Sequence, residues 1–155
     1  MMQYTVGILL VGSGSGSSLF ENGVPVAAML EGAGYLIGGM EAVSGEQRVL
    51  EEKLKAWSDC FDLIVTMGGI SLVPEDVVPE ATEAVCQRMI PGIGEAMRTR
   101  CYDLTPRAML SRGTAGIRGK TIILNLPGRA QPARENLEPV LPALEHGLFM
   151  LRKNG

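Results

Sequence analysis

Side chains that bind zinc are few and scattered in this 155-residue sequence, which has three cysteines and one histidine. Cys60, Cys86 and Cys101 lie far apart in the chain, no Cys-x-x-Cys pair occurs, and His146 has no cysteine near it. Zinc sites are built from clustered cysteine and histidine ligands, so the sequence argues against a zinc protein. An odd number of unclustered cysteines is typical of a protein from a reducing compartment.

The sequence also lacks an excess of positive charge and a long apolar run. Its 14 lysines and arginines are outnumbered by 17 aspartates and glutamates, which gives a net charge of −3. Proteins that bind duplex nucleic acid present a basic face, so we expect no nucleic-acid partner. The apolar run at residues 6–11 is too short to span a membrane, and no basic segment of a signal peptide precedes it. We therefore expect a cytoplasmic protein with no membrane partner.

Glycine, in contrast, is abundant at 20 residues, and apolar runs alternate with helical segments along the chain. Continuous apolar runs predict strands that are buried on both faces, as in parallel sheets. The alternation predicts a three-layer α/β fold, a doubly wound and mostly parallel sheet with helices on both faces, in one domain covering residues 1–155. The expected strands are residues 6–11, 35–40, 63–67 and 120–126, and the expected helices are 24–33, 76–87, 92–102 and a C-terminal stretch over 131–153.

Local signals predict one further helix and a break in the C-terminal stretch. Ser44 and Gln47 form a capping-box pattern that predicts the start of a helix. That helix places Leu50, Leu54 and Trp57 on one face. In the C-terminal stretch, Pro139 and Pro142 predict a split near Glu138, because an interior proline breaks a helix.

Three loops that follow predicted strands are rich in glycine, serine or proline, namely residues 12–18, 68–76 and 127–131. In a doubly wound sheet, ligands bind beyond the carboxyl ends of the strands, so these loops are expected to meet at one edge. Main-chain N–H groups in such turns bind phosphate without a net positive charge. The sequence therefore predicts a site for an anionic ligand.

Each candidate residue in these loops has a structural and a functional interpretation. Gly68 and Gly69 form either an ordinary turn or a place where the backbone approaches a ligand closely. Asp76 is either a helix N-cap or a Mg²⁺ ligand beside a triphosphate, with Glu75 as a possible helper. Arg112 either forms an exposed salt bridge or holds a phosphate with two parallel hydrogen bonds.

The segment from Met67 to Thr82 resembles the molybdopterin adenylyltransferase family, MogA/MoaB, most closely in its Asp-Val-x-Pro-Glu-Ala portion. Three further blocks follow in the family's order. Residues 90–98 are similar to its Pro-Gly-Phe-Gly-Glu segment, residues 108–112 to its Leu-Ser-Arg block, and residues 124–128 to its Leu-Asn-Leu-Pro-Gly block. Together these blocks span nearly the whole chain and are far more specific than any one alone.

The resemblance implies a reaction in molybdenum cofactor biosynthesis. In the family, molybdopterin is activated by Mg-ATP, which gives adenylylated molybdopterin and pyrophosphate, and the chains assemble into trimers or hexamers. Asp76 corresponds to a family aspartate implicated in catalysis and is the expected Mg²⁺ ligand. The other residues that the resemblance predicts to bind substrate are Ser13, Gly68, Gly69, Ile70, Ser71, Ser111, Arg112, Pro127 and Gly128.

Several family positions are changed here. A second family aspartate usually precedes the second helix, and Gly45 stands in its place. Glu46 is the neighbouring acid and the expected second catalytic residue, although it points about 100° further around the helix. The family's Gly-Gly-Thr-Gly turn has become Gly-Gly followed by Ile70 and Ser71. Two hypotheses stay open, an adenylyltransferase that relies on Asp76 and a non-catalytic pterin-binding or assembly protein.

A dinucleotide-binding module is a third hypothesis. Gly12 and Gly14 follow the first predicted strand, as in the Rossmann fingerprint. The third glycine of that fingerprint is missing, because Ser17 stands at its position. The nearest acid at a strand end is Glu41, later than the usual spacing of about 20 residues.

Overall fold

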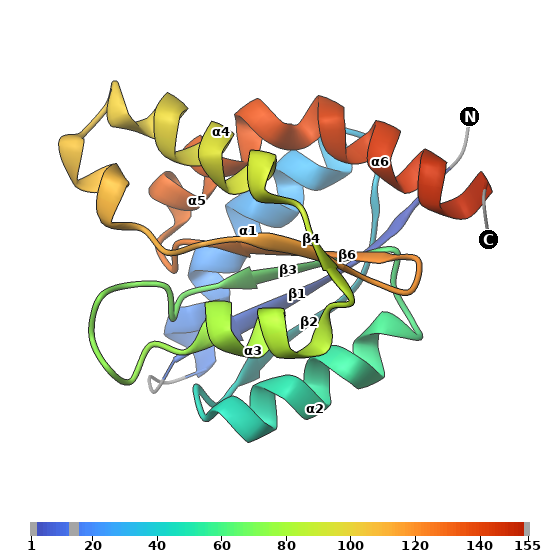
Figure 1. Cartoon of the computed structure of the whole chain (residues 1–155), viewed down its shortest axis with the longest axis horizontal. Helices are drawn as coiled ribbons and strands as arrows, with labels where there is room; N and C mark the ends of the chain where they lie inside the picture. Colours follow the sequence, from blue (N-terminus) through green and yellow to red (C-terminus); the bar gives the residue numbers. More distant parts are fainter. Residues whose placement is uncertain (1–2, 13–15, 154–155) are drawn as a thin grey trace.

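The computed structural model describes residues 3–12 and 16–153, which form a six-stranded sheet between two layers of helices (Figure 1). The spatial order is β2-β1-β3-β6-β5-β4, in which β2, β1, β3 and β6 run parallel to one another and β5 pairs antiparallel with both of its neighbours, β6 and β4. The predicted doubly wound, mostly parallel α/β fold is confirmed. The strands are β1 (Thr5–Val11), β2 (Leu36–Val43), β3 (Leu63–Met67), β4 (Arg88–Met89), β5 (Ala115–Arg118) and β6 (Thr121–Leu126).

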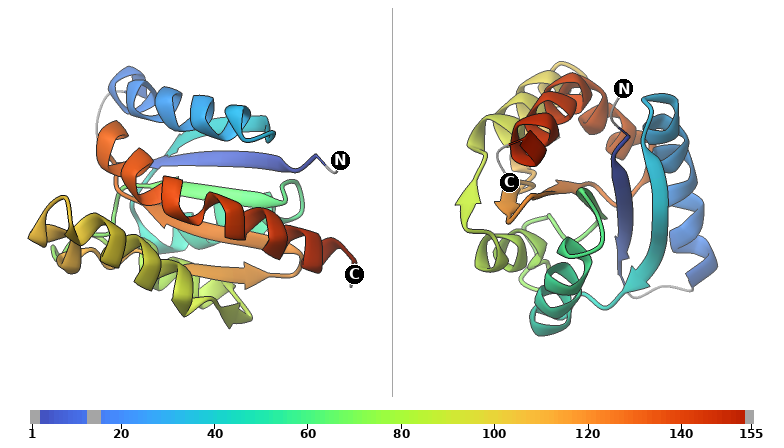
Figure 2. Two further views of the ribbon diagram at one scale, coloured as in Figure 1. Left: turned by 90° about the horizontal axis from the view of Figure 1, so that it is seen from above. Right: turned by 90° about the vertical axis from the view of Figure 1, so that its right-hand side faces the viewer.

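Helices cover both faces of this sheet (Figure 2). Two of them pack on one face and four on the other, and each face has its own hydrophobic core. The first face carries α2 (Gln47–Ser58) and α3 (Val78–Val85). The second face carries α1 (Gly16–Gly32), α4 (Pro91–Tyr102), α5 (Ala130–Leu137) and α6 (Leu141–Lys153), with short 3₁₀ segments η1 (Pro106–Leu110) and η2 (Glu138–Val140).

Strand β1 shows why a continuous apolar run is a strand here. Successive side chains of a strand point to opposite faces, and both faces of this sheet are covered by helices. Leu9 therefore packs in the core beneath α2 and α3, while Ile8 and Leu10 pack in the core beneath α1 and α4–α6. All three side chains are buried, which the run of apolar residues predicted.

Two expectations about helices are confirmed. Leu50, Leu54 and Trp57 are the buried residues of α2. The C-terminal stretch divides near Glu138, where α5 gives way to η2 and then to α6.

Two helix starts differ from the sequence prediction. Helix α1 begins at Gly16, well before residue 24, and contains Pro25 in its interior. Gly23 lies inside the helix, and a Cβ there would lie 2.9 Å from Met40 Sδ, so the glycine serves close packing on β2. The capping box at Ser44 is also wrong. Ser44 Oγ accepts a hydrogen bond from Glu46 N at 3.1 Å, and α2 begins only at Gln47.

The antiparallel edge of the sheet was not predicted. Strand β4 has two residues and β5 has four, too few for an apolar pattern to stand out. Helix α3 is correspondingly shorter than predicted, because Cys86 has an extended backbone (φ −90°, ψ 139°) that leads into β4.

Within residues 3–12 and 16–153, no helix is both long and apolar enough to cross a membrane.

Candidate functional site

The ends of β1, β3 and β6 meet at a glycine turn formed by Gly68 and Gly69. Gly68 N donates a hydrogen bond to Leu126 O at 2.9 Å. A Cβ added to Gly128 would lie 3.3 Å from Gly68 Cα, so the loops after β3 and β6 are in direct contact. The predicted convergence of these two loops is confirmed. Ser13, the predicted ligand residue of the first loop, lies outside the described residues.

Both glycines of this turn are required by its geometry. Gly68 and Gly69 have φ angles of 103° and 74°, in the region that side chains disfavour. A Cβ at Gly68 would also lie 2.6 Å from Val11 O, and one at Gly69 would overlap Val78 Cγ2. The turn therefore presses its backbone against β1 on one side and α3 on the other.

A cavity of about 490 Å³, here called the inner pocket, opens on one side of the glycine turn. It contains every predicted substrate residue of the described chain except Arg112. It also contains residues that sequence reasoning missed. The predicted members are Gly68, Gly69, Ile70, Ser71, Asp76, Ser111, Pro127 and Gly128, and the unpredicted ones include Thr105, Arg107, Arg129 and Asn136.

A second cavity of about 600 Å³, here called the acidic pocket, opens on the other side of the turn. Its lining includes the acidic residues Glu46, Glu75 and Asp76, and no lysine, arginine or histidine of the described chain. Gly45, where the family resemblance predicted the loss of a second aspartate, lines this pocket as well. Gly69 and Asp76 line both pockets, so they form the wall between them.

Asp76 is not the N-cap of α3, which was its structural interpretation. The N-cap position belongs to Val77, and no side chain caps this helix. Instead, Asp76 Oδ2 accepts a hydrogen bond from Ser71 N at 2.9 Å. This bond joins the two ends of the loop at residues 71–76. Within the described part of the chain, no hydrogen bond reaches Asp76 Oδ1, which leaves that oxygen for a ligand.

Arg112 binds both ends of the loop at residues 71–76 through its guanidinium group. Its Nη1 lies 2.6 Å from Glu80 Oε2, its Nε donates to Ser71 O at 2.9 Å, and its Nη2 donates to Asp76 O at 2.5 Å. The guanidinium is therefore engaged with the protein, and Arg112 lines neither pocket. The structure favours the salt-bridge interpretation over the phosphate-binding one, and it makes Arg112 a positioning residue for Asp76.

The Arg112–Glu80 pair gives a pH-dependent prediction. The hydrogen bond from Arg112 lowers the pKa of the Glu80 carboxyl. A carboxyl whose pKa is lower in the folded than in the unfolded protein stabilises the fold at pH values above its unfolded-state pKa, which is about 4.3 for glutamate. This stabilisation is lost as the pH falls through the lower pKa of the folded state. We expect Glu80→Gln to be less stable than wild type by under ~1 kcal/mol at pH 7, because the pair is half exposed.

Urea unfolding at several pH values tests this expectation. The difference between wild type and Glu80→Gln should shrink as pH falls from about 5 towards 3. Glu83→Gln, which removes an exposed charge from the same helix, is the matched control. A difference that grows on acidification would contradict the assigned pairing.

Arg98 and Gly94 support the inner pocket from α4, and neither was singled out from the sequence. Arg98 Nη1 donates to Gly113 O at 2.8 Å and to Ser111 O at 3.3 Å. A Cβ at Gly94 would lie 3.1 Å from Gly113 O, so glycine lets α4 approach this segment closely. These contacts hold Ser111 in the wall of the inner pocket.

Asn125, inside the apolar strand β6, links four parts of the site's framework. Its side chain is fully buried. Its Nδ2 donates to Thr66 Oγ1 and to Thr82 Oγ1, both at 3.0 Å, and its Oδ1 accepts from Thr114 N at 3.2 Å. An amide in an otherwise apolar strand was the sequence signal for this network.

Asn125→Leu is expected to destabilise the protein by about 2–4 kcal/mol, because it removes this partner from two buried hydroxyls, those of Thr66 and Thr82, and from the part-buried Thr114 N. Chemical denaturation measures the loss. Asn136→Leu is the control, because it removes a hydrogen bond to Pro132 O within a single helix, at 2.8 Å. A loss below ~1 kcal/mol for Asn125→Leu would show that the network is not a structural anchor.

Comparisons with known proteins agree with this architecture. The family described as "Probable molybdopterin binding domain" matches residues 14–146. The molybdopterin adenylyltransferase of Helicobacter pylori (strain ATCC 700392 / 26695) is 36% identical over 162 residues, which cover 99% of this chain and 91% of that protein. The molybdopterin adenylyltransferase of Escherichia coli K12 is 39% identical over 113 residues, which cover 69% of this chain and 58% of that one.

Solved structures give the same assignment. The molybdopterin biosynthesis enzyme MoaB of Thermus thermophilus superimposes with a TM-score of 0.84 at 40% identity, covering 96% of both chains. The molybdopterin biosynthesis Mog protein of Mycobacterium ulcerans superimposes with a TM-score of 0.88 at 30% identity, covering 99% of both chains. The chain therefore belongs to the molybdopterin-binding family of molybdenum cofactor biosynthesis proteins.

Proposed function

We propose that this chain binds molybdopterin in the inner pocket and adenylylates it with Mg-ATP that occupies the acidic pocket. The observation that carries the proposal is the shared wall, since Gly69 and Asp76 line both pockets. Adenylyl transfer requires the pterin phosphate and the α-phosphorus of ATP to meet in line. Two adjacent pockets that meet at an acidic residue suit that requirement.

We also propose that residues 1–155 act as one molybdopterin-binding domain.

The inner pocket has the features that a phosphorylated pterin needs. Its volume of about 490 Å³ falls in the range of small-molecule sites, roughly 300–1,000 Å³. Ile70 and Leu110 supply apolar surface for the ring system, and Ser71 supplies polar groups. Since Arg112 is engaged with Glu80, we assign the phosphate to Arg107 and Arg129, the two arginines among the residues that line the pocket.

The acidic pocket fits magnesium only together with a nucleotide. Within the described residues, no three acidic, cysteine or histidine side chains form a ready-made metal site. Mg²⁺ in nucleotide sites usually takes one or two carboxylates and completes its shell with phosphate oxygens and water. Asp76 is the expected Mg²⁺ ligand, with Glu46 or Glu75 as the second acid, because all three line this pocket. The metal supplies charge neutralisation between the two phosphorylated substrates.

In the proposed reaction, an oxygen of the pterin phosphate attacks the α-phosphorus of ATP. The bond from that phosphorus to the β-phosphate oxygen breaks, and pyrophosphate leaves. Such a transfer needs positioning and charge stabilisation more than a protein nucleophile. Arg107 and Arg129 orient the phosphate, and Arg112 and Ser71 keep Asp76 in place.

The acid missing at Gly45 makes a gain-of-function prediction possible. A Cβ at Gly45 would meet only Val11 Cγ1, at 3.7 Å, and Gly45 has no positive φ, so a side chain fits. Gly45→Asp is expected to raise the rate of adenylyl transfer at limiting Mg²⁺ about tenfold, because a second carboxylate strengthens metal binding.

Rates measured over a Mg²⁺ titration test this prediction. Gly45→Asn has nearly the same size without the charge, so it is the matched control and should leave the Mg²⁺ dependence unchanged. If Gly45→Asp and wild type have the same Mg²⁺ dependence, Glu46 or Glu75 already serves as the second carboxylate that binds the metal.

A non-catalytic pterin-binding protein is the second candidate, and the glycine at position 45 is the observation that favours it. The dinucleotide-binding hypothesis loses support, because the Glu41 carboxylate that it needs pairs with Lys53 Nζ at 3.2 Å. Assembly into trimers or hexamers stays a prediction of the family resemblance.

One assay separates the first two candidates. Purified protein is mixed with molybdopterin and Mg-ATP, and pyrophosphate and the pterin product are measured. The enzyme releases pyrophosphate only when both substrates are present. Pterin binding in a calorimeter without pyrophosphate release would leave the non-catalytic candidate. Absence of pterin binding would reject both.

A further inference from the structure

The inner pocket extends across the edge of the sheet, from one layer of helices to the other. Asp76 lines it from the loop before α3, and α3 packs on the first face of the sheet. Cys101 of α4 lines it as well, together with Glu135 and Asn136 of α5, and these two helices pack on the second face. Figure 1 shows α3 on one side of the sheet and α4 and α5 on the other. A ligand that fills this pocket therefore has one end beside Asp76 and the other beside α5.

The length of α5 determines which part of a phosphorylated pterin lies at each end. Arg129, to which the phosphate is assigned, is the N-cap residue of α5. Glu135 follows six residues later, which is about 9 Å along a helix that rises 1.5 Å per residue. With the phosphate at Arg129, the ring system extends along the helix towards Glu135 and Asn136.

Glu135 is an acid in a pocket that suits a phosphorylated ligand. Phosphate and carboxylate repel each other, so Glu135 disfavours a phosphate at its own end of the pocket. Its Oε2 accepts a hydrogen bond from Gln131 Nε2 at 3.1 Å, and no hydrogen bond from the described residues reaches Oε1. Burial and the Glu135 carboxylate raise the pKa of the Cys101 thiol, which places this carboxylate near α4. Glu135 therefore suits a ligand group that donates hydrogen bonds.

Asn136 adds a second acceptor beside Glu135. The residue is only 8% exposed, and its Nδ2 donates to Pro132 O at 2.8 Å. No hydrogen bond from the described residues reaches its Oδ1. Among those residues, Tyr35 OH is the one side-chain polar atom that is buried without a partner. Asn136 Oδ1 is therefore accessible, and the space that Asn136 lines is the inner pocket.

The ring of a pterin carries an edge of hydrogen-bond donors that matches these acceptors. Its 2-amino group and the neighbouring ring N–H point in the same direction, and one carboxylate accepts hydrogen bonds from two such donors. We propose that Glu135 binds this edge and makes the inner pocket specific for 2-amino-4-oxo ring systems, with Asn136 Oδ1 as a further acceptor. The inference rests on the proposed function and deepens it, because it names the part of the ring that is recognised and the residue that recognises it.

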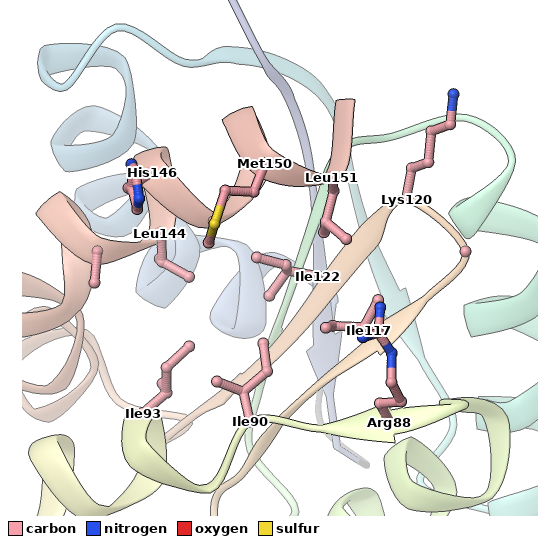
Figure 3. Close-up of a pocket in the computed structure, with 13 residues that line it drawn as sticks. Arg88, Ile90, Ile93, Ile117, Lys120, Ile122, Leu144, His146, Met150 and Leu151 are labelled. Carbon is pink, nitrogen blue, oxygen red and sulfur yellow. The ribbon is translucent and has the colours of Figure 1, made fainter. Parts of the chain in front are cut away.

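Another cavity of the described chain lacks such acceptors. Its volume is about 710 Å³, and it lies near the opposite end of β6, between α6 and the β4–β5 edge. Figure 3 shows Ile122 on the strand and Met150 reaching in from α6. Its lining includes Arg88, Lys120 and His146, and no acidic residue of the described chain. A ring edge made of N–H donors is therefore matched by the inner pocket and not by this cavity.

Fluorescence titration with two ring probes tests the assignment. The probes are 6-hydroxymethylpterin phosphate and its lumazine counterpart, in which an oxygen replaces the 2-amino group. Wild type should bind the pterin probe at least tenfold more tightly, because the lumazine turns an oxygen towards the Glu135 carboxylate. Glu135→Gln should weaken binding of the pterin probe at least tenfold without weakening that of the lumazine probe, because the amide can donate to the lumazine oxygen. A distorted pocket would instead weaken both.

Glu138→Gln is the matched control, because Glu138 is exposed at the end of α5 and outside the inner pocket. It should keep the preference of wild type for the pterin probe. Equal binding of the two probes by wild type, or an unchanged preference in Glu135→Gln, would overturn the inference and leave the proposed function standing. Calorimetry with molybdopterin completes the test. Binding of molybdopterin without binding of the pterin probe would also overturn the inference, and binding of neither would overturn the proposed function as well.

Discussion

Asp76→Asn is expected to lower the rate of adenylyl transfer by a factor of about 10²–10³ and to leave molybdopterin binding nearly unchanged. The change keeps the size of the side chain. The amide oxygen can still accept the hydrogen bond from Ser71 N, so the segment between the two residues should keep its conformation. What disappears is a negative charge at the point where the two pockets meet.

Single-turnover kinetics and calorimetry separate the two effects. The rate of pyrophosphate release should fall, while the molybdopterin dissociation constant should stay within about threefold, a change below ~1 kcal/mol. Glu83→Gln removes an exposed charge from α3 outside both pockets and should leave the rate unchanged. Transfer by Asp76→Asn within threefold of wild type would remove Asp76 from the reaction.

Gly68→Ala is expected to destabilise the protein by at least ~3 kcal/mol, the second large effect. Alanine at a φ of 103° is strained, and its Cβ would lie 2.6 Å from the main-chain oxygen of Val11. This oxygen belongs to the backbone of β1, so it cannot move away by a side-chain rotation. Relief of the overlap would have to separate the loop after β3 from the end of β1, which would also distort the inner pocket.

Urea unfolding measures this loss, and pterin binding at low temperature measures the distortion in molecules that stay folded. Gly32→Ala is the control, because a Cβ at Gly32 meets nothing within 4 Å at the end of α1. It should stabilise the protein by about 0.4–1 kcal/mol. Equal stability of wild type and Gly68→Ala would mean that the turn has a different conformation.

The sequence predicted the parallel part of the sheet because burial on both faces leaves a continuous apolar run, as at 63–67 and 121–126. It did not predict β5, because four residues that include a glycine carry no such pattern. Gly116 has a packing role, since a Cβ there would lie 2.6 Å from Cys86 Sγ. That contact joins segments far apart in the chain, and only the fold reveals it.

The position of the candidate site was predictable from strand ends, whereas the partners of its charged side chains were not. The glycine turn follows a buried strand, so its place at the sheet edge followed from topology. Arg112 had two interpretations because its partner, Glu80, belongs to a helix that meets it only in three dimensions. Arg107 went unnoticed for the same reason, since the pocket brings together η1 and the loop after β6.

The wall that Gly69 and Asp76 form has a thermodynamic consequence. Any factor by which bound nucleotide changes the pterin dissociation constant must equal the factor by which bound pterin changes that of the nucleotide. On the proposed function, Asp76 borders both pockets, and two polyanions side by side repel unless a cation lies between them. The coupling between the two substrates should therefore change from unfavourable towards favourable as the magnesium concentration rises.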